Sequence, residues 1–245
     1  MKINHLSETY IHLLKASLLN NIYIESEAKL AHVFGGMLNN HTLDFEDFFG
    51  NATPKIKEYV QLLSKIKKNG DTVVLARITE DGRREHHHEL RNITEIAHTM
   101  VGEKRLNNIK FCIDTVLNEN VPGDFIETGV WRGGACIFMR GVLKAYGVND
   151  RIVWCADSFD GVPDSSWLQD SNFNLSKSVL PVLAVPIEEV KELFKRYGLL
   201  DEQVKFLKGW FKDTLTEAPI DRISILRLDG DLYESTMNAL DPLYK

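Results

Sequence analysis

The stretch that decides the fold is Asp124-Phe-Ile-Glu-Thr-Gly-Val-Trp-Arg-Gly-Gly134, which joins a short apolar strand to the start of a helix. Its glycines allow a tight turn and a close approach of the backbone to a ligand, and the helix that follows offers free N–H groups. Pro122-Gly123 breaks the chain before it, and Gly147 suits the C-terminal turn of the helix. The stretch therefore predicts a strand–turn–helix unit.

Strands and helices alternate along the rest of the C-terminal part. The pattern predicts strands over 124–128, 151–156, 203–207 and 223–228, and helices over 104–118, 133–145, 186–198 and 234–243. This alternation is typical of βαβ units. We therefore expect an α/β fold with a doubly wound, mostly parallel, Rossmann-like sheet.

The N-terminal part has a weaker pattern. It predicts helices over 7–20 and 55–68, a strand over 71–78 and a polar loop over 81–88. We therefore expect a helical N-terminal extension or lid over 1–97 and the main domain over 98–245. His86-His-His88 is similar to a metal-binding tract, but its polar surroundings favour a solvated loop.

Composition narrows the class of protein. The 245 residues are 44% hydrophobic with a net charge of −6, which suits one sizeable core and argues against a partner such as duplex nucleic acid. Cys112, Cys136 and Cys155 are widely spaced, which predicts free thiols, a reducing compartment and hence a cytoplasmic location. We expect no signal peptide and no membrane span.

The glycine-rich turn carries the first functional pattern. Glu127-x-Gly129-x-x-x-Gly133-Gly134 departs from the dinucleotide fingerprint G-x-G-x-x-G. An acid just before the first glycine is typical of S-adenosylmethionine binding, with Glu127 orienting the amino-acid part. Asp157 ends the next strand, 23 residues beyond Gly134, where an acid accepts hydrogen bonds from a ribose diol. A tight turn without a ligand and a capping aspartate are the alternatives.

A second pattern follows the fourth strand. Asp229-Gly-Asp231 lies at its carboxyl end, where open α/β sheets bind ligands. The two carboxylates can converge on Mg²⁺, or divide into a metal ligand and a base; an ordinary Asp-Gly turn is the alternative. Trp210, after the third strand, either packs on an adenine ring or belongs to the core.

These residues resemble the macrocin and mycinamicin type of sugar O-methyltransferase. The resemblance spans about residues 98–245, and the opening helix is similar more loosely. It rests on His98-Thr-Met-Val-Gly-Glu-Lys-Arg-Leu-Asn-Asn108, Val121–Phe138, Ala156-Asp-Ser-Phe159, Arg196-Tyr-Gly-Leu-Leu-Asp201, Gly209-Trp-Phe-Lys-Asp-Thr214 and Leu226-Arg-Leu-Asp-Gly-Asp-Leu-Tyr233. It implies S-adenosylmethionine as methyl donor, Mg²⁺ as metal, and a hydroxyl of a sugar or other small natural product as acceptor, in secondary-metabolite (antibiotic) biosynthesis.

The resemblance also implies roles for single residues. Asp229 would ligate the metal, and Asp231 would be a base, a second ligand or both, so that both are catalytic. The cofactor would be bound by Thr99 and Met100 lining its pocket, Glu127, Thr128, Gly129 and Gly133 around its methionine end, Asp157 with Ser158 at its ribose, and Trp210 at its adenine.

The sequence departs from this family in two places. Residues 26–95 are longer and more divergent than the family's linker. The family continues with a strand bearing an Asp-Asp pair that completes the metal site, so we expect a C-terminally truncated chain with weak Mg²⁺-dependent turnover. A non-catalytic methyltransferase-like binding module and a nucleotide-dependent oxidoreductase are the alternatives, and the glycine spacing disfavours the second. A homo-oligomer built through the N-terminal helix is left open.

Overall fold

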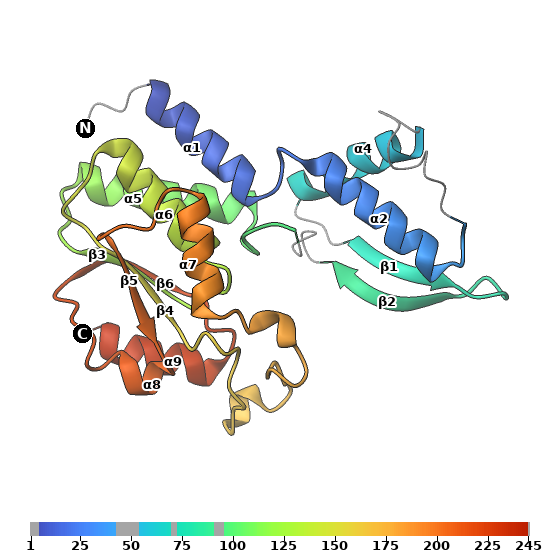
Figure 1. Cartoon of the computed structure of the whole chain (residues 1–245). Helices are drawn as coiled ribbons and strands as arrows, with labels where there is room; N and C mark the ends of the chain where they lie inside the picture. Colours follow the sequence, from blue (N-terminus) through green and yellow to red (C-terminus); the bar gives the residue numbers. More distant parts are fainter. Residues whose placement is uncertain (1–4, 43–53, 70–72, 91–95, 245) are drawn as a thin grey trace. The chain divides into compact units, whose positions relative to one another are not determined.

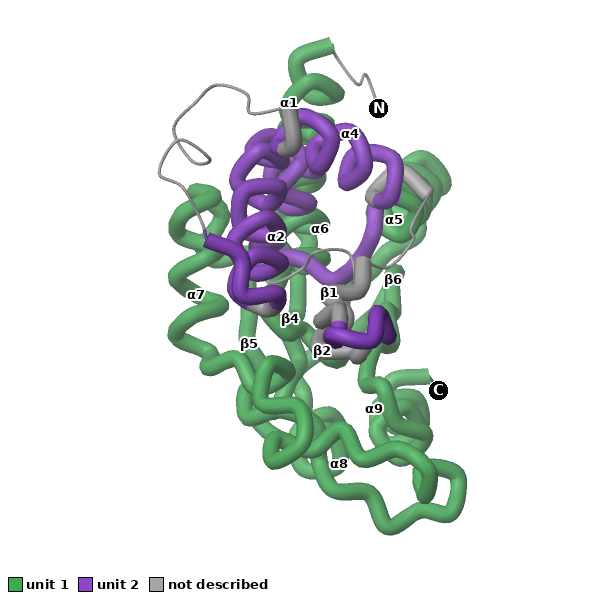
Figure 2. Tube along the Cα trace, turned by 90° about the vertical axis from the view of Figure 1, so that its right-hand side faces the viewer, with its two compact units in different colours: residues 1–14, 104–245 green, residues 15–103 purple. Residues whose placement is uncertain are grey.

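The chain divides into two compact units. The computed structural model describes residues 5–42, 54–69, 73–90 and 96–244. Unit 1 consists of Met1–Leu14 and Lys104–Lys245, and unit 2 of Lys15–Glu103 (Figure 2). Within the described residues, no helix is long and apolar enough to cross a membrane.

Unit 1 is built on a parallel sheet of four strands. They are β3 (Asp124–Thr128), β4 (Val153–Asp157), β5 (Val204–Lys208) and β6 (Ile223–Leu228). Their order in space is β5-β4-β3-β6, so the chain adds β4 and β5 on one side of β3 and then places β6 on the other. This reversal is a topological switch point, outside which doubly wound sheets bind ligands. The predicted α/β class is confirmed.

Helices cover both faces of this sheet (Figure 1). Alternate strand residues point to opposite faces. Ile126, Trp154 and Ala156 form one core cluster with Leu215 and Ala239. On the other face, the ring of Phe206 lies 5.9 Å from that of Phe194. The helices of the unit are α1 (His5–Leu18, shared with unit 2), α5 (Glu103–Asn118), α6 (Gly134–Tyr146), α7 (Ile187–Arg196), α8 (Phe211–Thr214) and α9 (Tyr233–Leu243).

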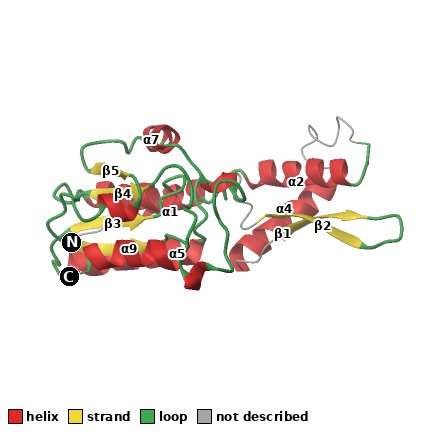
Figure 3. Ribbon diagram, turned by 90° about the horizontal axis from the view of Figure 1, so that it is seen from below, coloured by secondary structure: helices red, strands yellow, loops and turns green. Residues whose placement is uncertain are grey.

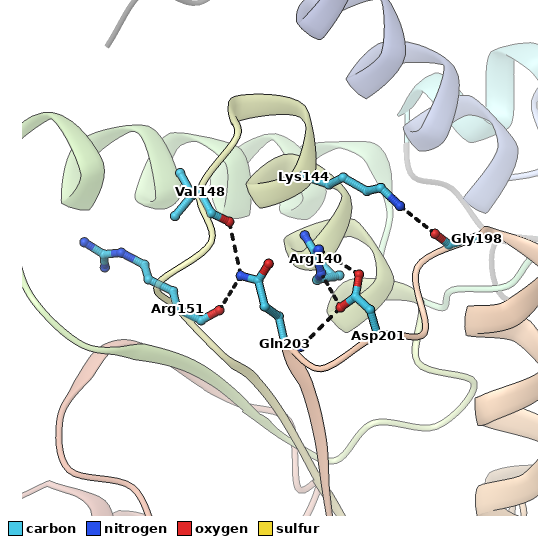
Figure 4. A network of polar contacts seen from close by, with 7 residues as sticks. All are labelled: Arg140, Lys144, Val148, Arg151, Gly198, Asp201 and Gln203. Carbon is cyan, nitrogen blue, oxygen red and sulfur yellow. Dashed lines mark hydrogen bonds and ion pairs between the residues drawn. The ribbon is translucent and has the colours of Figure 1, made fainter.

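A buried ion pair fastens α6 to the segment before β5 (Figure 4). Arg140 donates from Nε and Nη2 to the two carboxylate oxygens of Asp201, at 2.9 and 2.7 Å. The Gln203 side-chain amide donates to the carbonyl oxygens of Val148 and Arg151, at 3.1 and 2.7 Å. These contacts hold the segment before β5 against α6 and against the loop that follows α6.

Unit 2 combines helices with a hairpin (Figure 3). Ile56 and Leu63 pack against Ala28 to form its core cluster. The loop predicted over 81–88 is wrong in part, because a strand begins at Arg84. Antiparallel pairing uses backbone groups, so polar side chains do not prevent it. The elements are α2 (Ile24–Leu38), α4 (Pro54–Asn69), β1 (Val73–Ile78) and β2 (Arg84–Leu90).

Candidate active site

The ends of the sheet strands bring the predicted acids of unit 1 to one edge. Glu127 and Thr128 close β3, Asp157 closes β4, and Asp229 follows β6 directly. The Gly129 N–H donates to the carbonyl oxygen of Ala156 at 2.9 Å, and the Asp229 N–H donates to that of Thr128 at 2.8 Å. Backbone hydrogen bonds therefore join the three strand ends at the switch point.

Two glycines of the turn have no room for a side chain. Gly129 has a φ of +88°, and a Cβ there would lie 2.0 Å from the carbonyl oxygen of Asp229. Gly133 has a φ of +83°, and its Cβ would lie 2.8 Å from Cγ1 of Val190 on α7. Both positions need left-handed backbone and close approach, which glycine alone provides at low cost.

Asp157 anchors the glycine-rich turn. Its Oδ2 accepts hydrogen bonds from the N–H groups of Val130 at 2.6 Å and Trp131 at 3.4 Å, and its Oδ1 from that of Phe159 at 2.7 Å. Ser158 donates from Oγ to the carbonyl oxygen of Gly161 at 2.7 Å. Asp157 thus has a positioning role within the protein, and its predicted contact with a ribose stays a prediction.

Glu127 lies buried between a cation and a thiol. Its side chain is 3% exposed, Arg227 pairs with its Oε1, and Cys136 donates from Sγ to its Oε2 at 2.9 Å. Burial raises the pKa of Glu127 to about 7, while the positive charge of Arg227 lowers it. Arg227 also pairs with Asp229 at 2.9 Å. One guanidinium therefore joins the predicted cofactor acid to the predicted metal ligand.

Arg227 and Cys136 were not among the predicted site residues. Arg227 is the one charged residue in the strand Ile223–Leu228, two positions before Asp229 and so on the same face of the strand. A single charged residue in this strand, so close to Asp229, was visible in the sequence and could have indicated a site residue. Cys136 was predicted to be a free thiol, which is confirmed, and the structure shows that it is buried. Its hydrogen bond to Glu127 depends on the start of α6 facing β3, which a sequence pattern does not reveal.

The carboxylates after β6 form an acidic turn. Asp231 has a φ of +61°. Partial burial raises the pKa of Asp231, and the negative charges of Asp229 and Asp157 raise it further. In the part of the chain that is described, no group of three or more His, Cys, Asp or Glu side chains could hold a metal ion. The metal-tract interpretation of His86–His88 falls on side chains outside the described ones.

Three further predicted cofactor residues lie elsewhere. Trp210 precedes α8 and is 37% exposed, which speaks against the core alternative. Thr99 and Met100 belong to unit 2. Thr99 is buried and accepts a hydrogen bond from the Val101 N–H at 3.1 Å, whereas Met100 is partly exposed. Their predicted contacts with a cofactor stay predictions.

Comparison with known proteins gives consistent matches. The family model "Macrocin-O-methyltransferase (TylF)" matches residues 7–245. Demethyldecarbamoylnovobiocin O-methyltransferase of Streptomyces niveus is 56% identical over 165 residues, covering 66% of this chain and 63% of that protein. Mycinamicin III 3''-O-methyltransferase of Micromonospora griseorubida is 54% identical over 153 residues, covering 61% and 60%. The chain thus spans about three fifths of the length of these curated relatives.

Two solved structures that match this chain are also methyltransferases. The structure of the O-methyltransferase NovP matches 97% of this chain and 78% of that chain, with a TM-score of 0.68 and 40% sequence identity. The calicheamicin methyltransferase CalS11 matches 82% of this chain and 77% of that chain, with a TM-score of 0.50 and 20% identity. The second likeness concerns the fold alone.

Proposed function

Because the chain belongs to the macrocin O-methyltransferase (TylF) family, we propose that it transfers a methyl group from S-adenosylmethionine to a hydroxyl of a sugar or related natural product. The family implies the methyl donor. The observation that carries the proposal is the junction of Glu127, the glycine-rich turn and the Asp229–Asp231 turn at the switch point. A nucleotide-dependent oxidoreductase is disfavoured by the family match.

The residues at this edge suit the cofactor. S-adenosylmethionine carries a positive sulfonium and a positive ammonium group, and the carboxylates of Glu127, Asp157 and Asp229 make the edge negative. The Thr128 Oγ1 is buried without a hydrogen-bond partner at the end of β3. We propose that the methionine end is bound by Glu127, Thr128, Gly129 and Gly133, the ribose by Asp157 and Ser158, and the adenine beside Trp210.

Asp231 is the proposed base. Bound S-adenosylmethionine would supply an electrophilic methyl group. The Asp231 carboxylate would accept the proton of the acceptor hydroxyl as the oxygen bonds to that methyl group, and the methyl–sulfur bond would break to leave neutral S-adenosylhomocysteine. Its raised pKa suits this role, since a general base works best when its pKa lies near the working pH. Arg227 would hold the carboxylates of Asp229 and Glu127 in place.

Mg²⁺ assistance is a further part of the proposal. Mg²⁺ binds through one or two carboxylates and keeps several waters, and Asp229 and Asp231 are the carboxylates that would hold it. A bound cation would relieve the repulsion between these carboxylates and lower the pKa of a nearby hydroxyl. Calorimetric titration of Mg²⁺ into the wild type and into Asp231→Asn tests this. The proposed ligands are wrong if the substitution leaves the affinity unchanged.

An assay with labelled donor tests the activity itself. The wild type is incubated with methyl-labelled S-adenosylmethionine and the acceptors that the names of its relatives indicate, demethyldecarbamoylnovobiocin and mycinamicin III. We expect transfer of label to at least one sugar hydroxyl. Asp231→Asn should reduce turnover by about 100-fold or more, as is usual for loss of a general base. Full activity of this variant would contradict the assignment of the base.

Cofactor binding is expected to depend on pH through Glu127. Only the ionised carboxylate attracts the cofactor ammonium group, and burial raises its pKa to about 7. At pH 6 about one tenth of the carboxylate is ionised, so the affinity for S-adenosylhomocysteine should be about tenfold weaker at pH 6 than at pH 8. Calorimetry at both pH values, without Mg²⁺, measures this difference.

Two variants separate this effect from a general effect of pH. Glu127→Gln should bind more weakly, with nearly the same affinity at pH 6 and pH 8. The control Glu192→Gln changes an exposed carboxylate on α7 and should keep the tenfold difference. A pH dependence that survives in Glu127→Gln would show that another group causes it.

A further inference from the structure

The long loop between β4 and α7 is fastened to the first turn of α9 by Asp170. This residue is 4% exposed. Its Oδ1 accepts a hydrogen bond from the Tyr233 N–H at 2.7 Å, and its Oδ2 accepts one from the Glu234 N–H at 3.0 Å. Leu232, which precedes the helix, has no side-chain acceptor for these groups. Asp170 therefore caps α9 from a distant part of the chain, where a negative charge is also favourable.

The same carboxylate organises its own segment of the loop. Ser165 donates from Oγ to Asp170 Oδ2 at 2.8 Å, and this Oγ accepts a hydrogen bond from the Trp167 N–H at 3.2 Å. The Asp170 N–H donates to the carbonyl oxygen of Trp167 at 3.0 Å. Asp170 is thus bonded, directly or through one serine, to the backbones of both Trp167 and Tyr233.

The side chains of these two residues form a partly exposed aromatic pair. The centroids of the Trp167 and Tyr233 rings lie 5.5 Å apart, and the two residues are 41% and 42% exposed. Tyr233 follows Asp231, the proposed base, by two residues. A pair of aromatic side chains that is left open to solvent, close in sequence to a proposed reactive group, is suited to bind a ligand.

We propose that Trp167 and Tyr233 form an acceptor platform, on which the C–H face of a neutral sugar ring rests, and that Asp170 is the positioning residue that holds both rings beside Asp231. This inference rests on the proposed function. Aromatic faces carry partial negative charge and attract the positive edges of C–H groups. The hydroxyls at the rim of the sugar ring stay free to reach Asp231. The carboxylates of Asp229 and Asp231 disfavour a sugar that carries phosphate.

Binding of demethyldecarbamoylnovobiocin in saturating S-adenosylhomocysteine tests the platform. Trp167→Ala and Tyr233→Ala should each weaken this binding about tenfold, whereas Trp167→Phe and Tyr233→Phe should recover most of it. The control Leu168→Ala removes an 84% exposed side chain next to Trp167 and should bind within about twofold of the wild type. All variants should keep the wild-type affinity for S-adenosylhomocysteine, which shows that they fold.

The proposal of an acceptor platform is wrong if both alanine variants bind demethyldecarbamoylnovobiocin as tightly as the wild type does. It is also wrong if the wild type binds S-adenosylhomocysteine but neither this probe nor mycinamicin III. In that case the methyltransferase proposal still stands, because cofactor binding is retained. Absence of cofactor binding would instead overturn the proposed function.

Asp170→Asn tests the positioning role separately. It should weaken binding of the probe about tenfold, leave the affinity for S-adenosylhomocysteine unchanged, and speed hydrogen exchange at the amides of Tyr233 and Glu234. The control Asp164→Asn makes the same chemical change at an exposed position of the same loop and should alter none of the three. Wild-type probe binding and exchange in Asp170→Asn would contradict the positioning role.

Discussion

Replacement of Arg227 by methionine is expected to lower the free energy of unfolding by about 3–5 kcal/mol at pH 8. Arg227 is the cation that faces both Glu127, which is buried, and Asp229. Methionine preserves much of the side-chain volume but leaves the buried carboxylate without its counter-charge. Removal of one partner from a buried pair is costly because the other charge remains desolvated. Urea denaturation of the wild type and the variant measures the difference.

The loss of stability in Arg227→Met should also depend on pH. Without Arg227, the pKa of Glu127 rises above its wild-type value of about 7, so the variant holds a proton that the wild type has released. At pH 6 both proteins carry a mostly protonated Glu127, and the loss should be smaller than at pH 8. The deficit therefore grows as the pH rises through 7.

Arg222→Met is the matched control for this change. Arg222 precedes the same strand, and its pair with Asp221, at 3.5 Å, is exposed to solvent. Exposed ion pairs contribute little to stability, so the free energy of unfolding of this variant should differ from that of the wild type by less than about 0.5 kcal/mol. Equal losses for Arg222→Met and Arg227→Met would contradict the account of the buried network.

Replacement of Gly129 by alanine is expected to destabilise the protein by more than about 4 kcal/mol and to abolish cofactor binding. The new Cβ would lie 2.0 Å from the backbone oxygen of Asp229, and a φ of +88° is unfavourable for alanine. Relief of this overlap requires β3 and β6 to separate at the switch point. Thermal unfolding and calorimetry with S-adenosylhomocysteine measure the two effects.

Gly198→Ala separates the overlap from the backbone strain. Gly198 also has a positive φ, +65°, but a Cβ there meets no atom within 4 Å. We expect a loss of about 1–2 kcal/mol, the cost of left-handed backbone alone. Cofactor binding should be retained. If Gly129→Ala and Gly198→Ala lose the same stability and both retain cofactor binding, the close approach of the strands does not explain why position 129 needs glycine.

The sequence was most informative where the signal is local. The turn from Glu127 to Gly134 and the alternation of strands and helices predicted β3, α6 and the parallel sheet, because glycine spacing and hydrophobic periodicity act over short distances. The carboxyl-edge positions of Asp157 and Asp229 followed from the same rule. These features depend on the order of the elements, which a sequence shows directly.

The missed features depend on contacts between distant segments. Arg227 meets Glu127 across 100 positions, and Asp170 caps α9 across 63, so no local spacing indicates either contact. The strand that begins at Arg84 was not predicted, because its sequence is polar and lacks the hydrophobic pattern of a strand, although its backbone pairs with β1. Asp157 shows the converse: its position was predicted, but its hydrogen bonds to Val130 and Trp131 add a structural role.

In the proposed function, the sheet edge from Glu127 to Gly134, together with Asp157, binds S-adenosylmethionine. Calorimetric titration of S-adenosylmethionine into the wild-type protein at pH 8 tests this binding most directly. We predict saturable binding to one site per chain, with a Kd on the order of micromolar, or about −8 kcal/mol. Absence of saturable heat at millimolar S-adenosylmethionine would contradict it.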